Sequence, residues 1–517
     1  MTSWNRVAII GGGVSGLAVA YHLITRPDAP GDLEVVIFER GKTLGGNADT
    51  VSVRLGKNYA DPGRPDYERW ADLAVNDFNK TSYKNMVAAM TRIGFGEDRY
   101  KPLEDTICFF TPDGSVLYTE DDYFRPDARD RRRIVDERFH MRPELAEANQ
   151  KFMRTAADDV TERRSAFRSM TVEAYVADYI EKNKSQEALI KEMTAHLLYP
   201  RIAAMYFVDE RGPHRMPIVA VMDYYILQEN YPEVEKAERM YFDGGSQEWI
   251  NYLHQWLEGH HRTAEDDALP RISTRYDYPA KVLADETGVQ VYRADERGLL
   301  GRTAPERFDR VVFACYADDA LRSFGPQGMT DEIAAMLGKV SHTNSIAICH
   351  TFSGVLPPNR EAWRTYNVMI RGGAAMTPYS MTYVINRHQN DAENPAYQEA
   401  GLPHYFVTLN PAIRIPENFV LPTTRETGAE RVMRAPGYLC AGPAPLGKGE
   451  HPDPDKAIGW FKHNVVDFAC LEAQEMLPGL QGGAFGNVYF AGGWTNGAGL
   501  HEQCWLQGGK VVEAMYT

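Results

Sequence analysis

A glycine-rich stretch near the start of the chain, followed by an acid, is the first group of residues whose types and spacing could do chemistry. The run Gly11-Gly12-Gly13-Val14-Ser15-Gly16 fits the pattern G-x-G-x-x-G. In such a loop the glycines allow a tight turn and let the backbone approach a pyrophosphate. Glu39 follows at about the 20-residue spacing at which a carboxylate binds ribose hydroxyls. Together these residues predict a dinucleotide-binding site.

The segments around this loop predict the elements that hold it. Arg6–Ile10 is a short apolar run rich in β-branched residues, which is typical of a buried strand. Ser15–Thr25 has apolar residues at helical spacing, and Leu33–Phe38 is a second buried strand that ends at Glu39. This is the βαβ unit in which the helix N-terminus faces the phosphates. The unit alone does not separate FAD from NAD.

A second glycine pair, Gly45-Gly46, lies shortly after Glu39 and Arg40. This arrangement resembles the FAD-dependent amine oxidase superfamily, which includes monoamine oxidases, protoporphyrinogen oxidase and phytoene desaturases. The resemblance implies that the pair approaches the pyrophosphate and ribityl chain of FAD. An arginine commonly follows the pair in that family, whereas this chain has Asn47.

The C-terminal segment carries the same resemblance. Asn487–Ala491 is expected to form a strand that is followed by Gly492-Gly493, and Gly508 corresponds to the small residue that opens the last helix. The family's usual acid after the first glycine is replaced by Gly493. The resemblance implies that the flavin ring lies beside Leu500, His501 and Glu502. Because adjacent residues diverge at a helix start, at most one of His501 and Glu502 can face a substrate as an acid or base.

The middle of the chain fits the same family. Three strands are expected at Pro279–Leu283, Val289–Tyr292 and Asp309–Cys315, and the resemblance implies a backbone contact to adenine at Ala280. Arg239–Leu253 looks like the strand, glycine turn and helix that precede them. Other segments resemble a bacterial branch of amine oxidase-like, predicted NAD/FAD-binding proteins, namely Tyr199–Tyr206, Leu356–Asn367, Met381–His388 and Tyr405–Pro411.

The predicted fold is α/β, with a Rossmann-like FAD-binding domain of the glutathione-reductase and amine-oxidase type and an α+β substrate domain whose sheet is covered by helices. The FAD-binding domain is expected to be discontinuous and to comprise 1–60, 235–320 and 455–517. The substrate domain takes 61–234 and 321–454. Its first part includes a helix over Thr171–Lys182 with Thr171 as N-cap. Its second part has a helix near Thr330–Leu337 and three strands, Ser345–Phe352, Thr382–Ile385 and Tyr405–Leu409.

Composition excludes several classes of protein. The 517 residues carry a formal net charge of −15, so a nucleic-acid partner is not expected. None of the six cysteines forms a CxxC pair, so no metal site is expected. Six in 517 residues are too few for a disulfide scaffold, which predicts reduced thiols and a cytoplasmic setting. No uninterrupted apolar run reaches about 18 residues, so membrane association is not signalled. The charge run Arg125–Arg138 mixes acids with arginines and favours a solvated loop over an anionic-ligand or membrane site.

The predicted function is that of an FAD-dependent oxidoreductase in which flavin N5 takes hydride from a carbon of a small amine or amino acid. Many amine-oxidising members of the superfamily place a lysine near N5. The equivalent position in this chain falls at or near Asn344. That difference keeps open a desaturase or double-bond isomerase acting on a fatty-acid or carotenoid-like chain. A third alternative is a non-catalytic escort protein. The intact glycine loops disfavour it, because such a protein does not need them to bind a cofactor.

The sequence identifies no catalytic side chain. Three arginines are candidates to clamp a carboxylate, namely Arg201, Arg371 and Arg387. Four aromatic residues are candidates for a substrate cage, namely Trp494, Tyr379, Tyr383 and Tyr405. Cys504 is interpreted as a packed thiol rather than a covalent flavin attachment.

Overall fold

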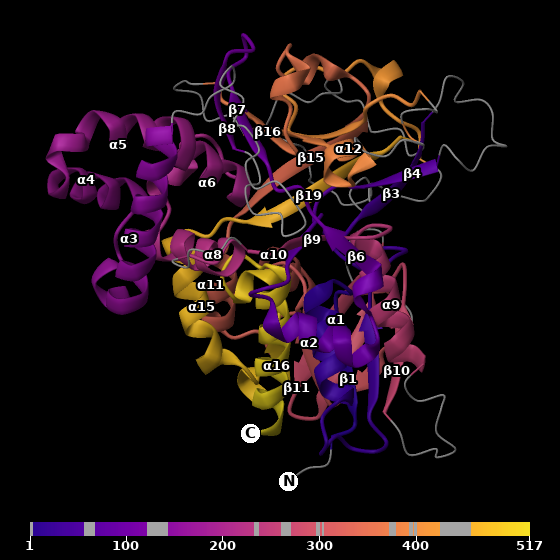
Figure 1. The fold of residues 1–517 in the computed structure, drawn as a ribbon. Helices are drawn as coiled ribbons and strands as arrows, with labels where there is room; N and C mark the ends of the chain where they lie inside the picture. The colour runs from indigo at the N-terminus through magenta and orange to yellow at the C-terminus, as the bar shows by residue number, and fades with distance from the viewer. Residues whose placement is uncertain are drawn as a thin grey trace.

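The computed structural model describes residues 4–55, 68–120, 143–231, 237–259, 270–295, 300–301, 304–371, 379–391, 397, 401–423 and 456–517. Two bodies lie one above the other in Figure 1. The lower body holds both ends of the chain and is built on a parallel sheet; the upper body is built on a mixed sheet, with an arm of helices beside it.

The lower body is a Rossmann-like sheet with helices packed on it. Its five strands run in the order β10-β2-β1-β14-β20, and every neighbouring pair is parallel. Their bounds are Arg6–Ile10 for β1, Glu34–Phe38 for β2, Arg271–Arg275 for β10, Arg310–Phe313 for β14 and Val488–Phe490 for β20. Residues of β1 alternate between two hydrophobic clusters, one on each face, which explains why the strands are apolar throughout.

Helices α1 (Val14–Ile24) and α16 (His501–Tyr516) pack against each other on one face of this sheet (Figure 1). The predicted strand–helix–strand unit is confirmed within one or two residues at each boundary. The prediction that Gly508 opens the last helix is wrong, because α16 begins at His501. Gly508 instead lies where α16 crosses α1, and a Cβ there would come within 2.8 Å of the Ala18 Cβ. A small residue is needed at this crossing.

The upper body contains a seven-stranded sheet in the order β19-β15-β18-β17-β16-β7-β8. The strands are Ile107–Phe110 (β7), Val116–Glu120 (β8), His342–His350 (β15), Tyr366–Met369 (β16), Ser380–Val384 (β17), Phe406–Leu409 (β18) and Ile458–Asn464 (β19). Neighbours are antiparallel except for β16 and β7. The three predicted strands are found here as β15, β17 and β18. Strand β19 falls within 455–517, the stretch expected in the FAD-binding part, yet it pairs with β15.

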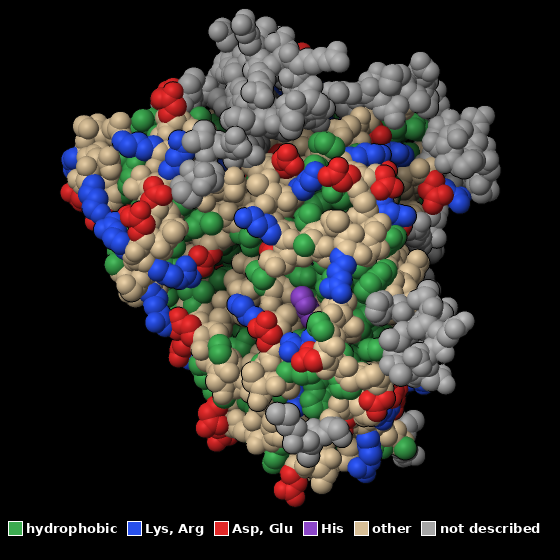
Figure 2. Space-filling view, turned by 60° about the horizontal axis from the view of Figure 1, so that its bottom comes forward, with side chains coloured by type: hydrophobic (Ala, Val, Ile, Leu, Met, Phe, Trp, Pro, Cys, Tyr) green, Lys and Arg blue, Asp and Glu red, His purple; other side chains and the backbone are tan. Residues whose placement is uncertain are grey.

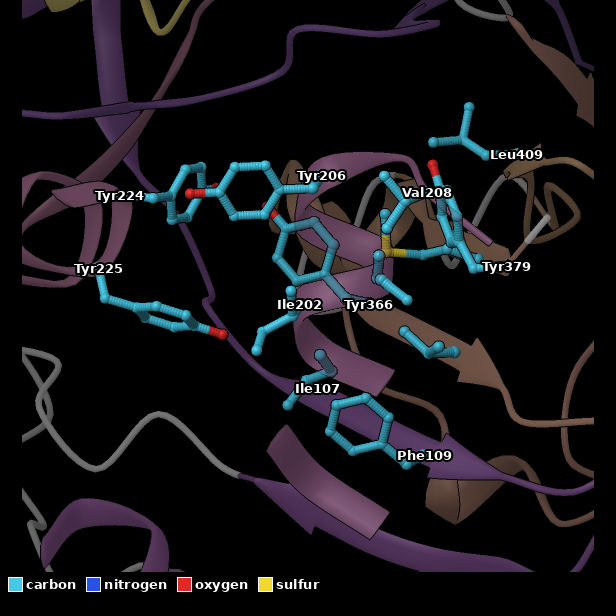
Figure 3. Packing of buried hydrophobic residues seen from close by; sticks show 14 of the residues in the cluster. Ile107, Phe109, Ile202, Tyr206, Val208, Tyr224, Tyr225, Tyr366, Tyr379 and Leu409 are labelled. Carbon is cyan, nitrogen blue, oxygen red and sulfur yellow. The ribbon is translucent and has the colours of Figure 1, made fainter. Parts of the chain in front are cut away.

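A helical arm covers part of this sheet. It comprises α3 (Pro143–Phe167), α4 (Val172–Lys182), α5 (Glu187–Met193), a π-helical turn (Thr194–Leu198), α6 (Tyr199–Tyr206), α7 (Gly212–Arg215) and α8 (Ile218–Glu229). Figure 3 shows Ile202 and Tyr206 of α6 packed with Ile107 and Tyr366 of the sheet. Thr171 caps α4 as predicted, because its side chain accepts a hydrogen bond from Ala174 N at 3.1 Å.

Smaller elements complete the two bodies. The strands are β3 (Thr50–Arg54), β4 (Glu68–Asp72), β5 (Phe78–Asn79), β6 (Tyr100–Pro102), β9 (Arg239–Phe242), β11 (Ala280–Asp285), β12 (Gly288–Arg293) and β13 (Glu306–Phe308). The helices are α2 (Lys84–Ile93), α9 (Ser246–Gly259), α10 (Ala317–Ser323), α11 (Asp331–Gly338), α12 (Ile385–His388) and α15 (Phe468–Leu480). Thr330 caps α11 by accepting from Ile333 N.

Surface charge, helix length and the cysteines relate to possible binding partners and to the cellular compartment. On the face seen in Figure 2, acidic and basic side chains are interspersed. Within the described ranges, no helix combines the length and the apolar character needed to cross a lipid bilayer. Five cysteines are free there, namely Cys108, Cys315, Cys349, Cys470 and Cys504. Cys440 and the charge run Arg125–Arg138 lie outside the described residues. The absence of a nucleic-acid partner stays a prediction.

Candidate functional site

A cavity of 1760 Å³ is lined by residues of both bodies. Its volume exceeds the roughly 300–1,000 Å³ of a typical small-molecule site, so it has room for a dinucleotide and a second molecule. One part lies at the carboxyl ends of β1 and β2, where open parallel sheets bind their ligands. The other part, called the chamber below, lies under the seven-stranded sheet and α6. It is lined by Asp77, Asp105, Ile107, Arg201, Met205, Tyr206, Phe207, Tyr224, Arg239, Tyr366, Met381, Tyr383 and His463.

The loop after β1 holds the carboxylate of Glu39 in a fixed position. Glu39 is buried at the end of β2, and its two carboxylate oxygens accept from Gly12 N at 2.9 Å and from Gly41 N at 2.7 Å. Gly11 has φ of 110°, and a Cβ there would lie 2.6 Å from the Ala314 carbonyl oxygen. Because that conformation and that space suit only glycine, the turn requires Gly11.

The two glycine loops meet and form a bare stretch of backbone on the cavity wall. Gly45 N donates to the Gly12 carbonyl at 2.9 Å, and Gly13 and Gly45 form a bridge of the parallel type. Gly45 and Gly46 have φ of 124° and 63°. A Cβ on Gly46 would lie 3.4 Å from the Gly13 Cα. This surface has no side chains and fits the close approach of a pyrophosphate.

A charged cluster borders this part of the cavity. Lys462, on β19 of the upper body, places its ammonium 2.6 Å from Asp318 Oδ1 and 3.2 Å from Asp319 Oδ2, both on α10 of the lower body. Arg40 and Arg322 also pair with Asp319. Burial alone would raise the pKa of Asp319, but Arg40, Lys462 and Arg322 outweigh it and hold that pKa at about 2. The two bodies are thus joined by an ionised network.

The chamber contains a second buried charge cluster, centred on Arg239. Its guanidinium pairs with Asp77, with Asp105 at 3.3 Å and with Glu229 at 3.5 Å. Burial opposes the charge of Arg239, but the surrounding carboxylates raise its pKa well above the ordinary value. Burial raises the pKa of Asp77 in spite of Arg239. Three carboxylates share this one guanidinium, an arrangement that would suit a positively charged ligand.

Aromatic rings line the chamber around this cluster. Tyr206, Tyr224 and Tyr366 gather there in Figure 3, and the rings of Tyr206 and Tyr224 are 5.2 Å apart. The Tyr206 hydroxyl donates to the Ala220 carbonyl at 2.7 Å. Phe207, which also lines the chamber, stacks on the His463 imidazole, with ring centroids 3.6 Å apart and planes 7° apart. The chamber is therefore a partly aromatic pocket with a few fixed polar groups.

One family model and several solved structures are similar to this chain. The family model of the NAD(P)-binding Rossmann-like domain matches residues 9–92. Cyclohexylamine oxidase from Brevibacterium oxydans IH-35A superposes with a TM-score of 0.55 at 15% identity, over 99% of both chains. A CLA-producing fatty acid isomerase from P. acnes gives 0.55 at 15% identity, over 98% of both. Putrescine oxidase bound to putrescine gives 0.51 at 13% identity, over 99% of both.

The chain has the amine oxidase fold. The resemblance first seen in the glycine loops therefore extends over the whole chain. No curated protein matches it in sequence. At identities of 15% and below, these structures establish the fold alone, and the chemistry has to be argued from the site.

Within this amine oxidase fold, most of the sequence-predicted residues line the cavity. They are Gly11, Gly13, Val14, Ser15, Glu39, Arg40, Gly45, Gly46, Asn47, Ala280, Gly493, Leu500 and His501. Gly16 and Gly492 are packing positions instead. A Cβ at Gly16 would lie 2.1 Å from the Gly11 carbonyl oxygen, and one at Gly492 would lie 2.0 Å from that of Cys315.

Glu502 was expected beside the flavin, but its side chain is used elsewhere. Its carboxylate accepts from Asn85 N at 3.0 Å, Asn85 Nδ2 at 2.6 Å and Met86 N at 2.9 Å, at the first turn of α2. A carboxylate is favoured there because it satisfies free N–H groups and complements the helix dipole. Of the pair His501-Glu502, only His501 lines the cavity.

His501 and Cys504, at the start of α16, are both uncharged. Burial lowers the pKa of His501 to about 4, so its imidazole is neutral near pH 7. Burial raises the pKa of Cys504 to about 11, and its thiol donates to the Gly499 carbonyl. A protonated thiol is a poor nucleophile, which agrees with a packed rather than a covalently attached cysteine.

The structure separates the candidate arginines and aromatic residues. Arg371 pairs with Glu210, and Arg387 pairs with Glu104, whereas Arg201 lines the chamber. Of the four predicted cage residues, Tyr383 lines the cavity, while Trp494, Tyr379 and Tyr405 are core residues. Sequence reasoning missed Tyr206, Phe207, Tyr224 and Tyr366. No spacing signals them, because they come from three separate elements.

Two departures from the family pattern meet at β19. Asn344 lies directly opposite Lys462 in the pairing of β15 with β19, and both line the cavity. The lysine is thus on the neighbouring strand, and its ammonium is held by Asp318 and Asp319. Asn47, in place of the family's arginine, donates to the Lys462 carbonyl at 3.2 Å. Asn47 therefore helps to join the two bodies.

Proposed function

We propose that this protein is an FAD-dependent oxidoreductase that takes hydride from the carbon next to nitrogen in an amine or amino acid. The observation that carries the proposal is the continuous cavity described above. It leads from a side-chain-free backbone surface suited to a pyrophosphate to an aromatic chamber with excess carboxylate. A cofactor and a cationic substrate could therefore meet inside one continuous cavity.

The residues that would hold FAD are those of the dinucleotide part of the cavity. Glu39 would bind the ribose, Gly13 and Gly46 would lie against the pyrophosphate, and Ala280 would contact the adenine; all four line the cavity. The N-terminus of α16, with His501, would face the ring. When bound, FAD supplies the hydride acceptor, and the protein supplies position and electrostatics. We propose the FAD-binding domain as 1–60, 235–320 and 455–517 and the substrate domain as 61–234 and 321–454, with β19 reassigned to the latter.

The chamber residues would bind and orient the amine. Asp77 and Asp105 attract an ammonium group, and the faces of Tyr366 and Tyr383 suit a cation. The arm helix α6 closes the chamber from the side with Met205 and Tyr206 and excludes water from the reacting carbon. We also propose a cytoplasmic setting, because six cysteines in 517 residues are too few for a disulfide scaffold.

A second candidate function is isomerisation or desaturation of an unsaturated fatty-acid or carotenoid-like chain. The specific observation in its favour is Arg201, a cation on the chamber wall that suits a carboxylate head group. The fatty acid isomerase among the similar structures has the same TM-score as cyclohexylamine oxidase. The carboxylate excess around Arg239 favours the amine instead.

The test begins with the purified protein and its absorbance near 450 nm, with the released cofactor identified by mass spectrometry. An amine and amino-acid panel is then assayed for hydrogen peroxide and ammonia, and oleate and linoleate for shifted double bonds. Turnover of an amine supports the proposal. Turnover of the fatty acids alone supports the second candidate. A protein that takes up no FAD contradicts both functions and favours the non-catalytic escort protein.

A further inference from the structure

The end of β19 separates the cofactor part of the cavity from the chamber. Lys462 points to Asp318 on α10 of the lower body. The Asn464 amide nitrogen lies 3.6 Å from the position that a Cβ would take at Gly493. Both side chains thus face the lower body. Because side chains alternate along a strand, His463 faces the opposite way, into the chamber.

The ring of His463 is held by Phe207. The two rings are stacked, with centroids 3.6 Å and planes 7° apart, and Tyr379 meets the Phe207 ring edge-on at 5.7 Å. Phe207 follows α6 with φ of 55°, a left-handed conformation that is rare for a large side chain. This conformation places the Phe207 ring flat against the imidazole, so the plane of His463 is set by a second element.

The two nitrogens of His463 differ in what surrounds them. Nδ1 is buried and has no hydrogen-bond partner among the described residues. Nε2 is not among the buried unpartnered atoms, and His463 lines the cavity, so we infer that Nε2 faces it. Burial lowers the pKa of His463 to about 3, so the imidazole stays neutral near pH 7. A neutral imidazole on a chamber wall can exchange a hydrogen bond with a bound molecule without adding charge.

We propose that His463 is a substrate-contacting residue, whose Nε2 hydrogen-bonds the polar group beside the carbon that is oxidised, while Phe207 fixes the plane of the ring. The inference rests on the proposed function and deepens it by naming the group that orients the substrate. The neighbouring residues Lys462 and Asn464 face the cofactor part of the cavity. The end of β19 would therefore contribute to both cofactor binding and substrate binding. For an amine substrate this polar group is the nitrogen.

Two variants separate the hydrogen bond from the stacking. His463→Phe keeps an aromatic ring against Phe207 but removes both nitrogens. His463→Gln gives up the ring but restores an amide nitrogen near the place of Nε2. His350→Phe is the matched control, since His350 is a buried neutral histidine of the same sheet that does not line the cavity. Each holoprotein is assayed with cyclohexylamine, and in parallel with oleate, for KM, kcat and FAD affinity.

We expect His463→Phe to raise KM at least ten-fold and His463→Gln to recover it to within about three-fold, with FAD affinity unchanged in both. Parent-like KM and kcat in His463→Phe would overturn the inference. Loss of FAD in that variant would also overturn it, because it would place His463 on the cofactor side. A parent protein that binds FAD but responds to neither probe contradicts the proposed function itself and removes the basis of the inference.

Discussion

Gly11 and Gly13 lie two residues apart in the loop after β1, yet they are glycines for different reasons. Gly11 has a left-handed φ and no room for a Cβ. Gly13 has φ of −75°, which any residue adopts, and the nearest atom to a Cβ there would be the Gly46 Cα at 3.8 Å. The backbone conformation at position 13 therefore does not require glycine. Glycine is needed there because a side chain would project into the cavity.

Substitution of these two glycines should have opposite consequences. Gly13→Val should leave the melting temperature almost unchanged and weaken FAD binding at least ten-fold, or about 1.4 kcal/mol, because its side chain fills the pyrophosphate cradle. Gly11→Ala should destabilise the fold by about 1–3 kcal/mol through backbone strain and a clash with Ala314. Fluorescence titration with FAD and urea unfolding measure the two effects. Equal FAD affinity in Gly13→Val and parent would refute the cradle.

Glu502 allows a similar distinction at the start of α2. Glu502→Gln should lower the free energy of unfolding by about 1–2 kcal/mol, since the helix loses a charged acceptor at its N-terminus. FAD affinity should stay as in the parent, because the side chain does not line the cavity. Urea unfolding and FAD titration on the same sample check both. A changed flavin spectrum with unchanged stability would indicate that Glu502 contacts the cofactor instead.

At the scale of elements, the ion pairs of Lys462 connect β19 with α10. The ammonium is buried, so Lys462→Met should cost about 2 kcal/mol of stability and raise the pKa of Asp319 from about 2. Lys339→Met is the control, because Lys339 pairs with the more exposed Glu472 and should cost less than about 1 kcal/mol. Similar losses in urea unfolding for the two variants would argue against a connecting role.

The elements that the sequence predicts well are those whose signal is local. The βαβ unit around Gly11–Gly16 and the helix capped by Thr171 depend on neighbouring residues alone, and the structure agrees with both. Gly508 was misassigned because a glycine at a helix crossing looks like a glycine at a helix end. Its reason is Ala18, which lies far away in the sequence.

The chamber could not be predicted, because long-range pairing assembles it. Asp77 precedes β5, whose Asn79 pairs with Arg239 in β9, and Leu103 N binds the Arg239 carbonyl near Asp105. Each of these residues looks like an ordinary surface charge in the sequence. Only the strand pairing reveals that they meet in the interior. Residues that bind cofactor through motifs are therefore visible early, whereas residues that select the substrate are not.

At the scale of the whole molecule, buried titratable groups predict how stability depends on pH. Burial lowers the pKa to about 3 for His350, His388 and His463 and to about 4 for His501. In the unfolded chain each has a pKa of about 6.5. The stability that these residues contribute is therefore present above about pH 6.5 and is lost as pH falls toward 4.

One buried carboxyl acts in the opposite direction. Burial raises the pKa of Asp72 to about 7, although Thr50 and Ser246 donate hydrogen bonds to it. Stability from this group is present below its unfolded pKa of about 3.9 and is lost as pH rises through about 7. The four histidines outweigh this single carboxyl between pH 4.5 and 7.5, because the unfolded chain binds more protons at them than the folded protein binds at Asp72.

The free energy of unfolding should therefore be highest near pH 7.5, change only slightly between pH 7.5 and 6.5, and fall steeply toward pH 4.5. Urea unfolding at pH 4.5, 5.5, 6.5 and 7.5 measures this profile. Asp72→Asn should make the fall from pH 6.5 to 4.5 steeper, because the carboxyl that opposes the histidines is gone. His350→Gln should reduce the acid loss, because one proton fewer is taken up on unfolding. Stability that stays level or rises as pH falls from 6.5 to 4.5 would show that these histidines titrate in the folded protein as they do in water.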